Sequence, residues 1–309
     1  RWARFLEEAG HEVIVEETWD GAEAELMISL HARRSHPSIS AFATQHPDLP
    51  LVVVLTGTDL YRDLPADENA RESLELATRL VVLQEAGLDE LEDRHRKKAR
   101  MIYQSAEPPE PSEPSGPAAP DERFFDVLVA GSLRGVKDPF RAALAARILP
   151  PDSRIRVLHA GKADDGRFER EALAHMNASP RYHWLGELPH SEVRRLISRS
   201  RLLVQSSLME GGANAICEAL AAGTPVIASG IPGNIGMLGE NYPGYYPVGD
   251  TEALAAVLEK AEHEAGFYKS LRAACEARQH LVLPGRERGA LEALVAKIAA
   301  ESRNRAGDI

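Results

Sequence analysis

Short runs of apolar, often β-branched residues alternate with helix-like patterns along most of the chain. The strand candidates are 26–30, 51–55, 80–83, 101–103, 125–130, 155–159, 202–205 and 225–228. Uninterrupted apolar runs are typical of strands that are covered on both faces, as in parallel sheets. Helical patterns between them complete β-α-β units, so the pattern predicts an α/β fold.

The chain opens on a helix pattern. Apolar side chains recur on one face of residues 1–9, and Gly10 suits the C-terminal cap of such a helix. A strand-like run follows at 13–15. Because an α/β domain rarely begins with a bare helix, we expect a first strand and its loop to precede Arg1.

One segment interrupts the alternation of strands and helices. Residues 106–122 begin with AEPPEPSEPSGPAAP, a composition that favours a semi-rigid extended linker. It separates a first α/β domain, 1–105, from a second, 123–285. The second domain ends in helical patterns near 251–265 and 267–279, and a last helical pattern follows near 287–300.

Length and composition agree with two globular domains. The 309 residues suit two domains of about 150 residues each, and 44% are hydrophobic. Acidic residues outnumber basic ones by 47 to 36, which argues against a nucleic-acid binder. The two cysteines imply no disulfide framework. With no apolar run near 18 residues and no signal peptide, we expect a cytoplasmic protein that binds no membrane.

The first motif with chemical content is MEGGANAICEAL, residues 209–220, which follows a strand candidate and opens a helix. Gly211 and Gly212 would let a ligand approach the backbone closely. The helix N-terminus offers free N–H groups and a positive dipole end, both suited to a diphosphate. Glu210 before the helix and Glu218 inside it can accept hydrogen bonds from sugar hydroxyls. The competing interpretation is a glycine-rich loop with two solvated acids.

A second motif, AGSLRGVKDP at 130–139, lies at the end of the first strand of the second domain. The carboxyl ends of strands are where α/β sheets bind ligands. Arg134 and Lys137 can therefore reach a diphosphate and neutralise a departing nucleotide. Alternatively they are ordinary surface cations.

A third motif, SGIPGNIGMLG at 229–239, also follows a strand candidate. It lacks the clean strand-turn-helix context and later acid of a dinucleotide fingerprint. We interpret it as a loop facing a sugar, with a plain structural turn as the alternative.

Together these motifs resemble the retaining GT-B glycosyltransferases of the large family four. Glu210 and Glu218 match its pair of glutamates, and Arg134 and Lys137 match its basic pair. The resemblance implies two Rossmann-like domains that face each other across a cleft. It also implies that the C-terminal segment 286–309 returns toward the first domain.

The same resemblance implies roles for single residues. Glu218 would bind the donor ribose, while Glu210 would face the transferred hexose and act in catalysis with Arg134 and Lys137. The donor-binding residues would be Glu218, Gly131, Gly211, Gly212, Ala213 and Asn214.

A closer resemblance covers nearly the whole chain. The segments that carry it are 30–35 (LHARRS), 55–64 (LTGTDLYRDL), 102–106 (IYQSA), 184–187 (WLGE), 209–214 (MEGGAN) and 233–250. In combination they resemble the selenosugar synthases of selenoneine biosynthesis, which implies joining a UDP-sugar to selenophosphate through a carbon–selenium bond. Ser132 departs from the histidine expected there, so no role is carried over to its side chain.

Two groups of polar side chains follow neighbouring strand candidates of the first domain. They are HARRSH at 31–36 and TGTD at 56–59. Arginine forks suit a phosphate-type anion, and threonine hydroxyls and a glycine N–H add donors. The competing interpretation is a solvated loop and an aspartate turn. The predicted acceptor-binding residues are Arg33, Arg34, Thr56, Gly57 and Thr58.

The favoured function is thus a glycosyl transfer from a UDP-sugar, such as UDP-glucose or UDP-N-acetylglucosamine, to selenophosphate. One alternative is transfer to a hydroxyl acceptor, for which no positioned base stands out in the sequence. The other is a catalytically silent nucleotide-sugar-binding protein. The glutamate pair implies retention by resemblance only, and an anionic nucleophile could equally invert. No His/Cys/Asp cluster has metal-ligand spacing, so we expect no cofactor and no metal.

Overall fold

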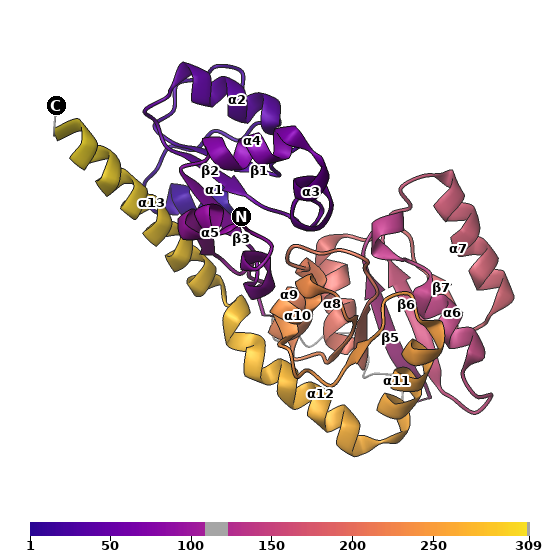
Figure 1. Cartoon of the computed structure of the whole chain (residues 1–309). Helices are drawn as coiled ribbons and strands as arrows, with labels where there is room; N and C mark the ends of the chain where they lie inside the picture. Colours follow the sequence, from indigo (N-terminus) through magenta and orange to yellow (C-terminus); the bar gives the residue numbers. More distant parts are fainter. Residues whose placement is uncertain (109–122, 308–309) are drawn as a thin grey trace. The chain divides into compact units, whose positions relative to one another are not determined.

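The computed structural model describes residues 1–108 and 123–307, with side chains to residue 303, as two compact units (Figure 1). The first unit combines Arg1–Gln104 with Pro284–Ile309, and the second is Ser105–Leu283. Most of the expected linker, residues 109–122, lies outside the described residues.

The first unit is built on a parallel sheet of four strands in the order β1-β2-β3-β4. The strands are β1 (Met27–Leu30), β2 (Leu51–Val54), β3 (Arg79–Val82) and β4 (Ala99–Met101). The helices of this unit are α1 (Trp2–Glu8), α2 (His36–Gln45), α3 (Leu64–Ala66), α4 (Glu68–Leu76), α5 (Asp93–Lys98) and α13 (Pro284–Gly307). Two further elements of this unit are not α-helical, namely the π-helix η1 (Asp59–Asp63) and the 3-10 helix η2 (Glu85–Leu88).

Strand β2 shows why its residues form a buried parallel strand. Leu51 and Val53 point into a core shared with residues of α2 and α4. Val52 and Val54 point to the other face and pack against residues of α13. All four side chains are buried, as alternation across a doubly covered strand requires.

Helix α13, expected over 286–309, begins at Pro284 and supplies that second layer. Its Leu294 and Ile298 pack on the sheet, and Leu291 and Val295 pack on α1. Near its start, Glu287 is 1% exposed and accepts a 2.6 Å hydrogen bond from the Trp2 indole.

The second unit is a six-stranded parallel sheet in the order β10-β9-β8-β5-β6-β7. The strands are β5 (Phe125–Ala130), β6 (Ile155–Ala160), β7 (Tyr182–Trp184), β8 (Leu202–Gln205), β9 (Val226–Ser229) and β10 (Tyr245–Tyr246). The helices are α6 (Arg141–Ile148), α7 (Gly166–Ala178), α8 (His190–Arg199), α9 (Asn214–Ala222), α10 (Pro232–Leu238), α11 (Thr251–His263) and α12 (Ala265–Arg278), with 3-10 turns η3 (Gly135–Lys137) and η4 (Gln279–Val282).

The strand order of this sheet determines where a ligand can bind. Counted along the chain within the unit, the order is that of a dinucleotide-binding Rossmann sheet, and it reverses between β5 and β8. Such a reversal leaves a crevice beyond the carboxyl ends of the two strands. The motifs at 130–139 and 209–220 directly follow these two strands.

The predicted α/β fold with parallel sheets is confirmed, and β5 and β8 have the predicted bounds. Strands β7 and β10 were not predicted. The strand predicted at 13–15 is wrong, because that segment pairs with none of the strands among the described residues, and Ile14 and Val15 are 59% and 78% exposed.

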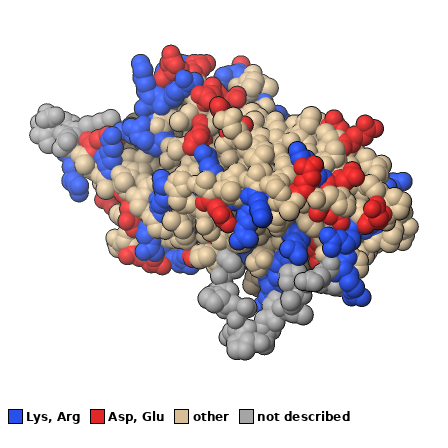
Figure 2. All heavy atoms as spheres, turned by 90° about the horizontal axis from the view of Figure 1, so that it is seen from below, with Lys and Arg blue, Asp and Glu red and all other residues tan. Residues whose placement is uncertain are grey.

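Two properties of the surface and of the helices bear on binding partners. Acidic and basic side chains are both spread over the face drawn in Figure 2, although the chain carries a net charge of -11. Of the helices that the structure describes, none combines the length and the hydropathy needed to cross a membrane.

Candidate functional site

The two loops that follow β5 and β8 are tied to each other. The Leu208 N–H donates to the Val136 carbonyl at 2.8 Å. The Ser206 hydroxyl lies 3.1 Å and 2.9 Å from the carbonyls of Lys137 and Asp138. These contacts fix the predicted basic loop against the predicted glutamate loop.

The carboxylate of Glu210 is the centre of this junction. Glu210 is 8% exposed, and its Oε1 atom forms an ion pair with Lys137. The same atom accepts hydrogen bonds from Ser207 Oγ at 2.6 Å and from Gln205 Nε2 at 2.8 Å. The structure thus brings the predicted Glu210 and Lys137 together. Sequence reasoning missed Gln205 and Ser207, whose only signal was polarity at the end of an apolar strand.

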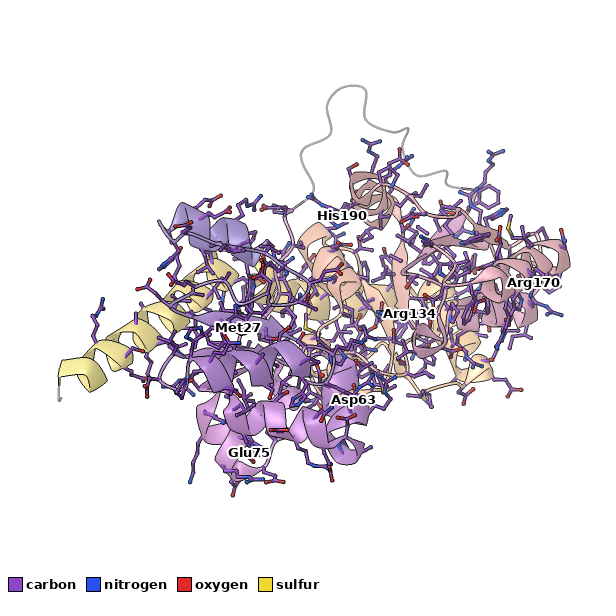
Figure 3. The ribbon with its side chains drawn as sticks, turned by 90° about the horizontal axis from the view of Figure 1, so that it is seen from above. Met27, Asp63, Glu75, Arg134, Arg170 and His190 are labelled. Carbon is purple, nitrogen blue, oxygen red and sulfur yellow. The ribbon has the colours of Figure 1, made fainter. Side chains whose placement is uncertain are left out.

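Arg134 stands apart from this network. It immediately precedes η3, its side chain is exposed, and it has no side-chain partner within the part of the chain that the structure describes (Figure 3). The predicted Gly131 lies nearby at the end of β5, where its carbonyl is 3.2 Å from the buried ring of His159. A Cβ atom on Gly161 would lie 1.9 Å from that carbonyl, so the ends of β5 and β6 approach too closely for any side chain.

Helix α9 begins behind the predicted glycines. Its N-cap residue is Ala213, which makes no side-chain capping bond, so the first N–H groups of the helix are left for a ligand. Gly211 is buried, Gly212 is half-buried and Asn214 is exposed. This is the geometry expected of an anion site at a helix N-terminus.

Glu218 lies one turn into the same helix and is 14% exposed. Its Oε1 atom pairs with His190 Nε2 at 2.6 Å, and that histidine side chain is 72% exposed. His190 begins α8 and is labelled in Figure 3. Sequence reasoning did not single it out, because nothing along the chain indicates that α8 and α9 meet there.

The third motif has a structural role that the sequence did not show. It forms the strand-turn-helix of β9 and α10, contrary to our expectation, because Pro232 at the first helical turn starts a helix despite three glycines nearby. A Cβ atom on Gly233 would lie 1.9 Å from the carbonyl oxygen of Glu210. Helix α10 therefore supports the backbone that carries Glu210.

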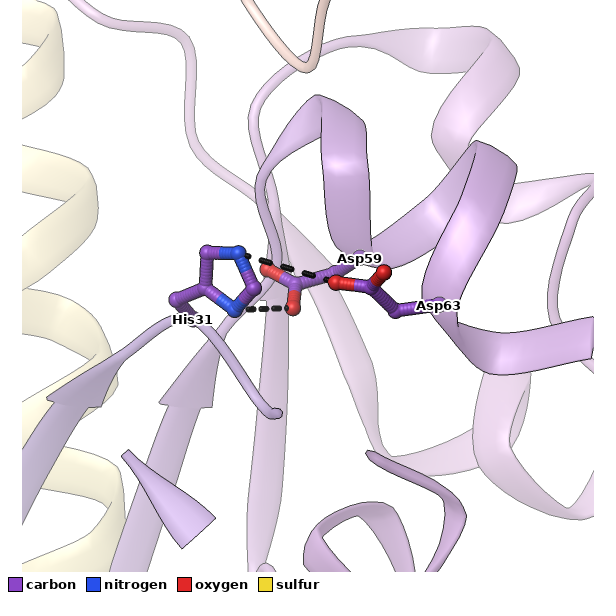
Figure 4. Close-up of side chains that lie close together, drawn as sticks. All are labelled: His31, Asp59 and Asp63. Atoms are coloured by element: carbon purple, nitrogen blue, oxygen red, sulfur yellow. Dashed lines mark ion pairs between the residues drawn. The ribbon is translucent and has the colours of Figure 1, made fainter. Parts of the chain in front are cut away.

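In the first unit, His31 connects the ends of β1 and β2. Its Nδ1 atom lies 2.6 Å from Oδ1 of Asp59 (Figure 4). Its Nε2 atom lies 2.9 Å from the Thr58 hydroxyl. Asp59 is fully buried, and its other oxygen accepts the Thr56 N–H at 2.8 Å. His31 has φ +75°, a left-handed conformation that costs about 1 kcal/mol or more outside glycine. Such conformations cluster at functional sites.

Next to this pair, the carboxylate of Asp63 contacts two arginines. Its carboxylate contacts Arg62 Nε at 2.9 Å and Arg33 Nε at 3.0 Å. Burial raises the pKa of the Asp63 carboxyl, but the hydrogen bonds from Arg62 and Arg33 outweigh it and hold that pKa below its usual value. Of the two predicted arginines, Arg33 is thus engaged by Asp63, whereas Arg34 is exposed.

The predicted acceptor residues of the TGTD loop lie at the same edge. The hydroxyls of Thr56 and Thr58 are 3.4 Å apart and both residues are half-buried, while Gly57 is buried. The π-helix η1 starts immediately after them and presents Asp59 and Asp63 to His31. π-Helices are rare in proteins, and those that occur are frequently found at functional sites.

His31, Asp59 and Asp63 offer ligand atoms that lie within 4.8 Å of one another, a grouping that a cation could use. Residue spacing along the chain did not reveal it. However, both carboxylates already face cations or donors, namely His31 at Asp59 and two arginines at Asp63. A divalent ion would have to displace these partners, so we assign no ion to the cluster.

Comparison with known proteins places these observations in a family. The profile of the family Glycosyl transferases group 1 matches residues 115–279. The "Glycosyltransferase 1 domain-containing protein 1" of Xenopus tropicalis is 36% identical over 109 residues, which are 35% of this chain and 31% of that protein.

Solved structures of GT-B glycosyltransferases share the fold. HepE of Anabaena, in complex with UDP and glucose, superposes with a TM-score of 0.71 at 15% identity, covering 90% of this chain and 78% of that one. Sucrose-phosphate synthase of Thermosynechococcus elongatus gives 0.69 at 18% identity, with 90% and 74% covered. A trehalose-phosphate synthase of Burkholderia xenovorans, in complex with glucose-6-phosphate, gives 0.69 at 12% identity, with 88% and 72% covered.

Proposed function

This chain belongs to the group 1 glycosyl transferases, and we propose that it transfers a sugar from a UDP-sugar to selenophosphate. The observation that carries the transferase proposal is the junction of Glu210 and Lys137 beside the uncapped start of α9. It combines a fixed carboxylate, a cation and free backbone donors at the reversal point of a Rossmann sheet.

On the donor side, the first N–H groups of α9 and the exposed Arg134 would hold the diphosphate. Lys137 and Arg134 would stabilise the negative charge that develops on the departing UDP, as preorganised donors do in general. Glu218 would bind the ribose, and Glu210 would orient the hexose. UDP as the nucleotide is supported by the UDP and UDP-glucose complexes of the fold neighbour HepE.

On the acceptor side, Arg34 and the hydroxyls of Thr56 and Thr58 would hold the phosphoryl oxygens and leave selenium free to attack. The selenium atom forms a bond to the anomeric carbon, and the bond from that carbon to the UDP oxygen breaks. The selenophosphate acceptor rests on the sequence segments of both domains described above. We propose that the reaction needs no metal.

A second candidate is transfer to a hydroxyl acceptor. The observation that favours it is the buried His31–Asp59 pair beside two threonine hydroxyls, because an alcohol needs a base to remove its proton. Sequence reasoning had found no such base.

The direct test is turnover followed by mass spectrometry. Purified protein would be incubated with UDP-glucose or UDP-N-acetylglucosamine and selenophosphate, with and without EDTA. We expect UDP and a selenium-containing sugar, unaffected by EDTA, and loss of both products in Lys137→Met. UDP-sugar that remains intact with selenophosphate but is consumed with a panel of alcohols would support the second candidate. Binding of UDP without any turnover would indicate a silent binding protein.

A further inference from the structure

We propose that Thr58, His31 and Asp59 form a proton-accepting chain for an acceptor that arrives with a proton on its attacking group. Three distances carry the proposal: 3.4 Å from Thr56 Oγ1 to Thr58 Oγ1, 2.9 Å from Thr58 Oγ1 to His31 Nε2, and 2.6 Å from His31 Nδ1 to Asp59 Oδ1. The inference rests on the proposed function, because it places the acceptor at this edge of the first unit.

Burial rises steadily from the threonines through His31 to Asp59. The two threonines are half-buried, His31 is 7% exposed and Asp59 is fully buried. A ligand can therefore touch the hydroxyl end but not the carboxylate end. The order of hydroxyl, imidazole and buried carboxylate is the one that proton-accepting triads use on unrelated folds.

The proposal requires one tautomer of His31. Nδ1 lies 2.6 Å from Asp59 Oδ1, and the proposed chain uses the ring that carries its proton on Nδ1. The Arg34 N–H donates to Nδ1 at 3.3 Å, a hydrogen bond that this tautomer gives up. Nε2 then accepts from Thr58, which is the state of a ring able to take up a proton.

The remaining groups around His31 favour this role. Asp59 Oδ1 has no well-aligned hydrogen bond in this structure, as is common for catalytic contacts before substrate binds. Asp63 Oδ2 lies 3.8 Å from Nε2 and would add a second negative charge near the imidazolium. Arg33 and Arg62 pair with Asp63 and neutralise most of that charge.

The proposed step is balanced. The attacking atom of the acceptor forms a bond to the anomeric carbon, and the electron pair of the broken bond leaves with UDP. The acceptor proton passes to the Thr58 oxygen while the Thr58 proton passes to His31 Nε2. Asp59 stabilises the resulting imidazolium, which later returns the proton to water. The acceptor can be a hydroxyl or a hydrogen-bearing selenophosphate anion, since both lose one proton.

The test compares four variants with matched chemistry. His31→Asn removes the imidazole but tolerates the left-handed backbone. Asp59→Asn removes the charge and keeps the shape. Thr58→Val removes the hydroxyl, and Thr58→Ser restores it. Thermal midpoints and UDP affinity would be measured on each, to separate folding and donor binding from catalysis.

We expect His31→Asn, Asp59→Asn and Thr58→Val to lower kcat for selenosugar formation by about 10²–10⁴-fold, the range of a positioned base. Acceptor KM should change less than threefold in His31→Asn and Asp59→Asn, and Thr58→Ser should keep the wild-type rate within threefold. A raised KM with unchanged kcat would overturn the proposal and make this a binding site only. Equal losses in Thr58→Ser and Thr58→Val would overturn it as well.

A failure of the proposed function would look different. If the wild-type enzyme makes no selenosugar, its hydrolysis of UDP-sugar by water, also a proton-bearing nucleophile, becomes the readout. The same order of variants in hydrolysis would support the proton-accepting chain while rejecting selenophosphate. Selenosugar formation that is unaffected in all four variants would reject the chain alone.

Discussion

The two glutamates of the candidate donor site are held in different ways. One oxygen of Glu210 faces a cation and two neutral donors, so the carboxylate is fixed before any ligand binds. Glu218 has His190 as its partner, and that side chain is mostly in water. A sugar hydroxyl can replace such an exposed partner at little cost, whereas a ligand at Glu210 would have to use the other carboxylate oxygen.

This difference predicts opposite effects of two substitutions on UDP binding. Glu218→Gln should weaken UDP binding by about one to two decades, because a hydrogen bond to a charged group is lost. His190→Ala should leave the affinity equal or raise it by up to about fivefold, since an exposed ion pair contributes about 1 kcal/mol at most. Titration calorimetry with UDP measures both. A large loss of affinity in His190→Ala would mean that the histidine itself binds the nucleotide.

His159 predicts how stability depends on pH. Burial lowers the pKa of this histidine to about 4, and its two nitrogens contact the Tyr182 hydroxyl and the Gly131 carbonyl. An unfolded chain protonates histidine near pH 6.5, so between pH 6.5 and 4 the unfolded state binds the extra proton. The free energy of unfolding should therefore fall by about 3 kcal/mol over this window from this residue alone.

The substitution His159→Gln isolates that contribution. Denaturant unfolding at pH 7 and at pH 4.5 should show that the variant is less stable at pH 7 and that the gap to the wild type narrows at pH 4.5. Curves that stay parallel would show that His159 does not titrate on unfolding.

At the scale of elements, the short helix α10 packs so closely against the backbone of Glu210 that its residue 233 has no room for a side chain. Gly233→Ala would place a Cβ atom 1.9 Å from the Glu210 carbonyl oxygen, so one of the two backbones must shift. We expect a loss of about 1–3 kcal/mol of stability, as overpacking typically costs, and a slower transfer reaction.

Gly266→Ala is the matched control for this change. Gly266 lies in helix α12 of the same unit, with nothing within 4 Å of its added Cβ atom. It should stabilise the protein by about 0.5–1 kcal/mol, the usual gain for alanine in a helix. Denaturation curves and turnover rates check both variants. A Gly233→Ala protein with normal stability and rate would mean that α10 does not position Glu210.

The elements also show where sequence reasoning succeeds. Strands β5 and β8 were predicted because their buried apolar runs have no other interpretation. Strand β7 was missed, since Tyr182 is the one buried residue of the three and the others are half-buried. The predicted run at 13–15 shows the converse, because apolar residues without a neighbouring strand do not pair.

In the candidate site, too, some residues could be predicted from the sequence and others could not. Glu210, Lys137 and Glu218 could be predicted as site residues because their motifs directly follow strands that meet at the sheet reversal. The pairing of His31 with Asp59 was not, because it depends on a left-handed backbone at His31 and on contact between the ends of two strands. Neither property is visible in residue spacing.

At the scale of the whole molecule, the first unit depends on the far end of the chain. Leu291 is fully buried between α13 and α1, and Lys297 of the same helix is exposed. Leu291→Ala should cost about 2–5 kcal/mol of stability, whereas Lys297→Ala should change it by less than about 0.5 kcal/mol.

These variants should leave UDP affinity unchanged, because the candidate donor residues all belong to the second unit. Thermal unfolding with and without UDP, together with calorimetry, measures both quantities. Weakened UDP binding in Leu291→Ala, at a temperature where the protein stays folded, would show that the donor site needs the first unit intact.

Because the first unit is built from two separate stretches of the chain, its parts are synthesised at different times. The ribosome completes the second unit, residues 105–283, before it makes the helix that covers Val52, Val54 and Val81. A nascent chain stalled with α13 still in the exit tunnel should therefore carry a protease-resistant second unit and a cleavable first one. If the first unit were already resistant at that length, the helix would be dispensable for folding. With the expected order, the sheet of the first unit remains uncovered until α13 has been made, and its apolar face is exposed to chaperones in the interval.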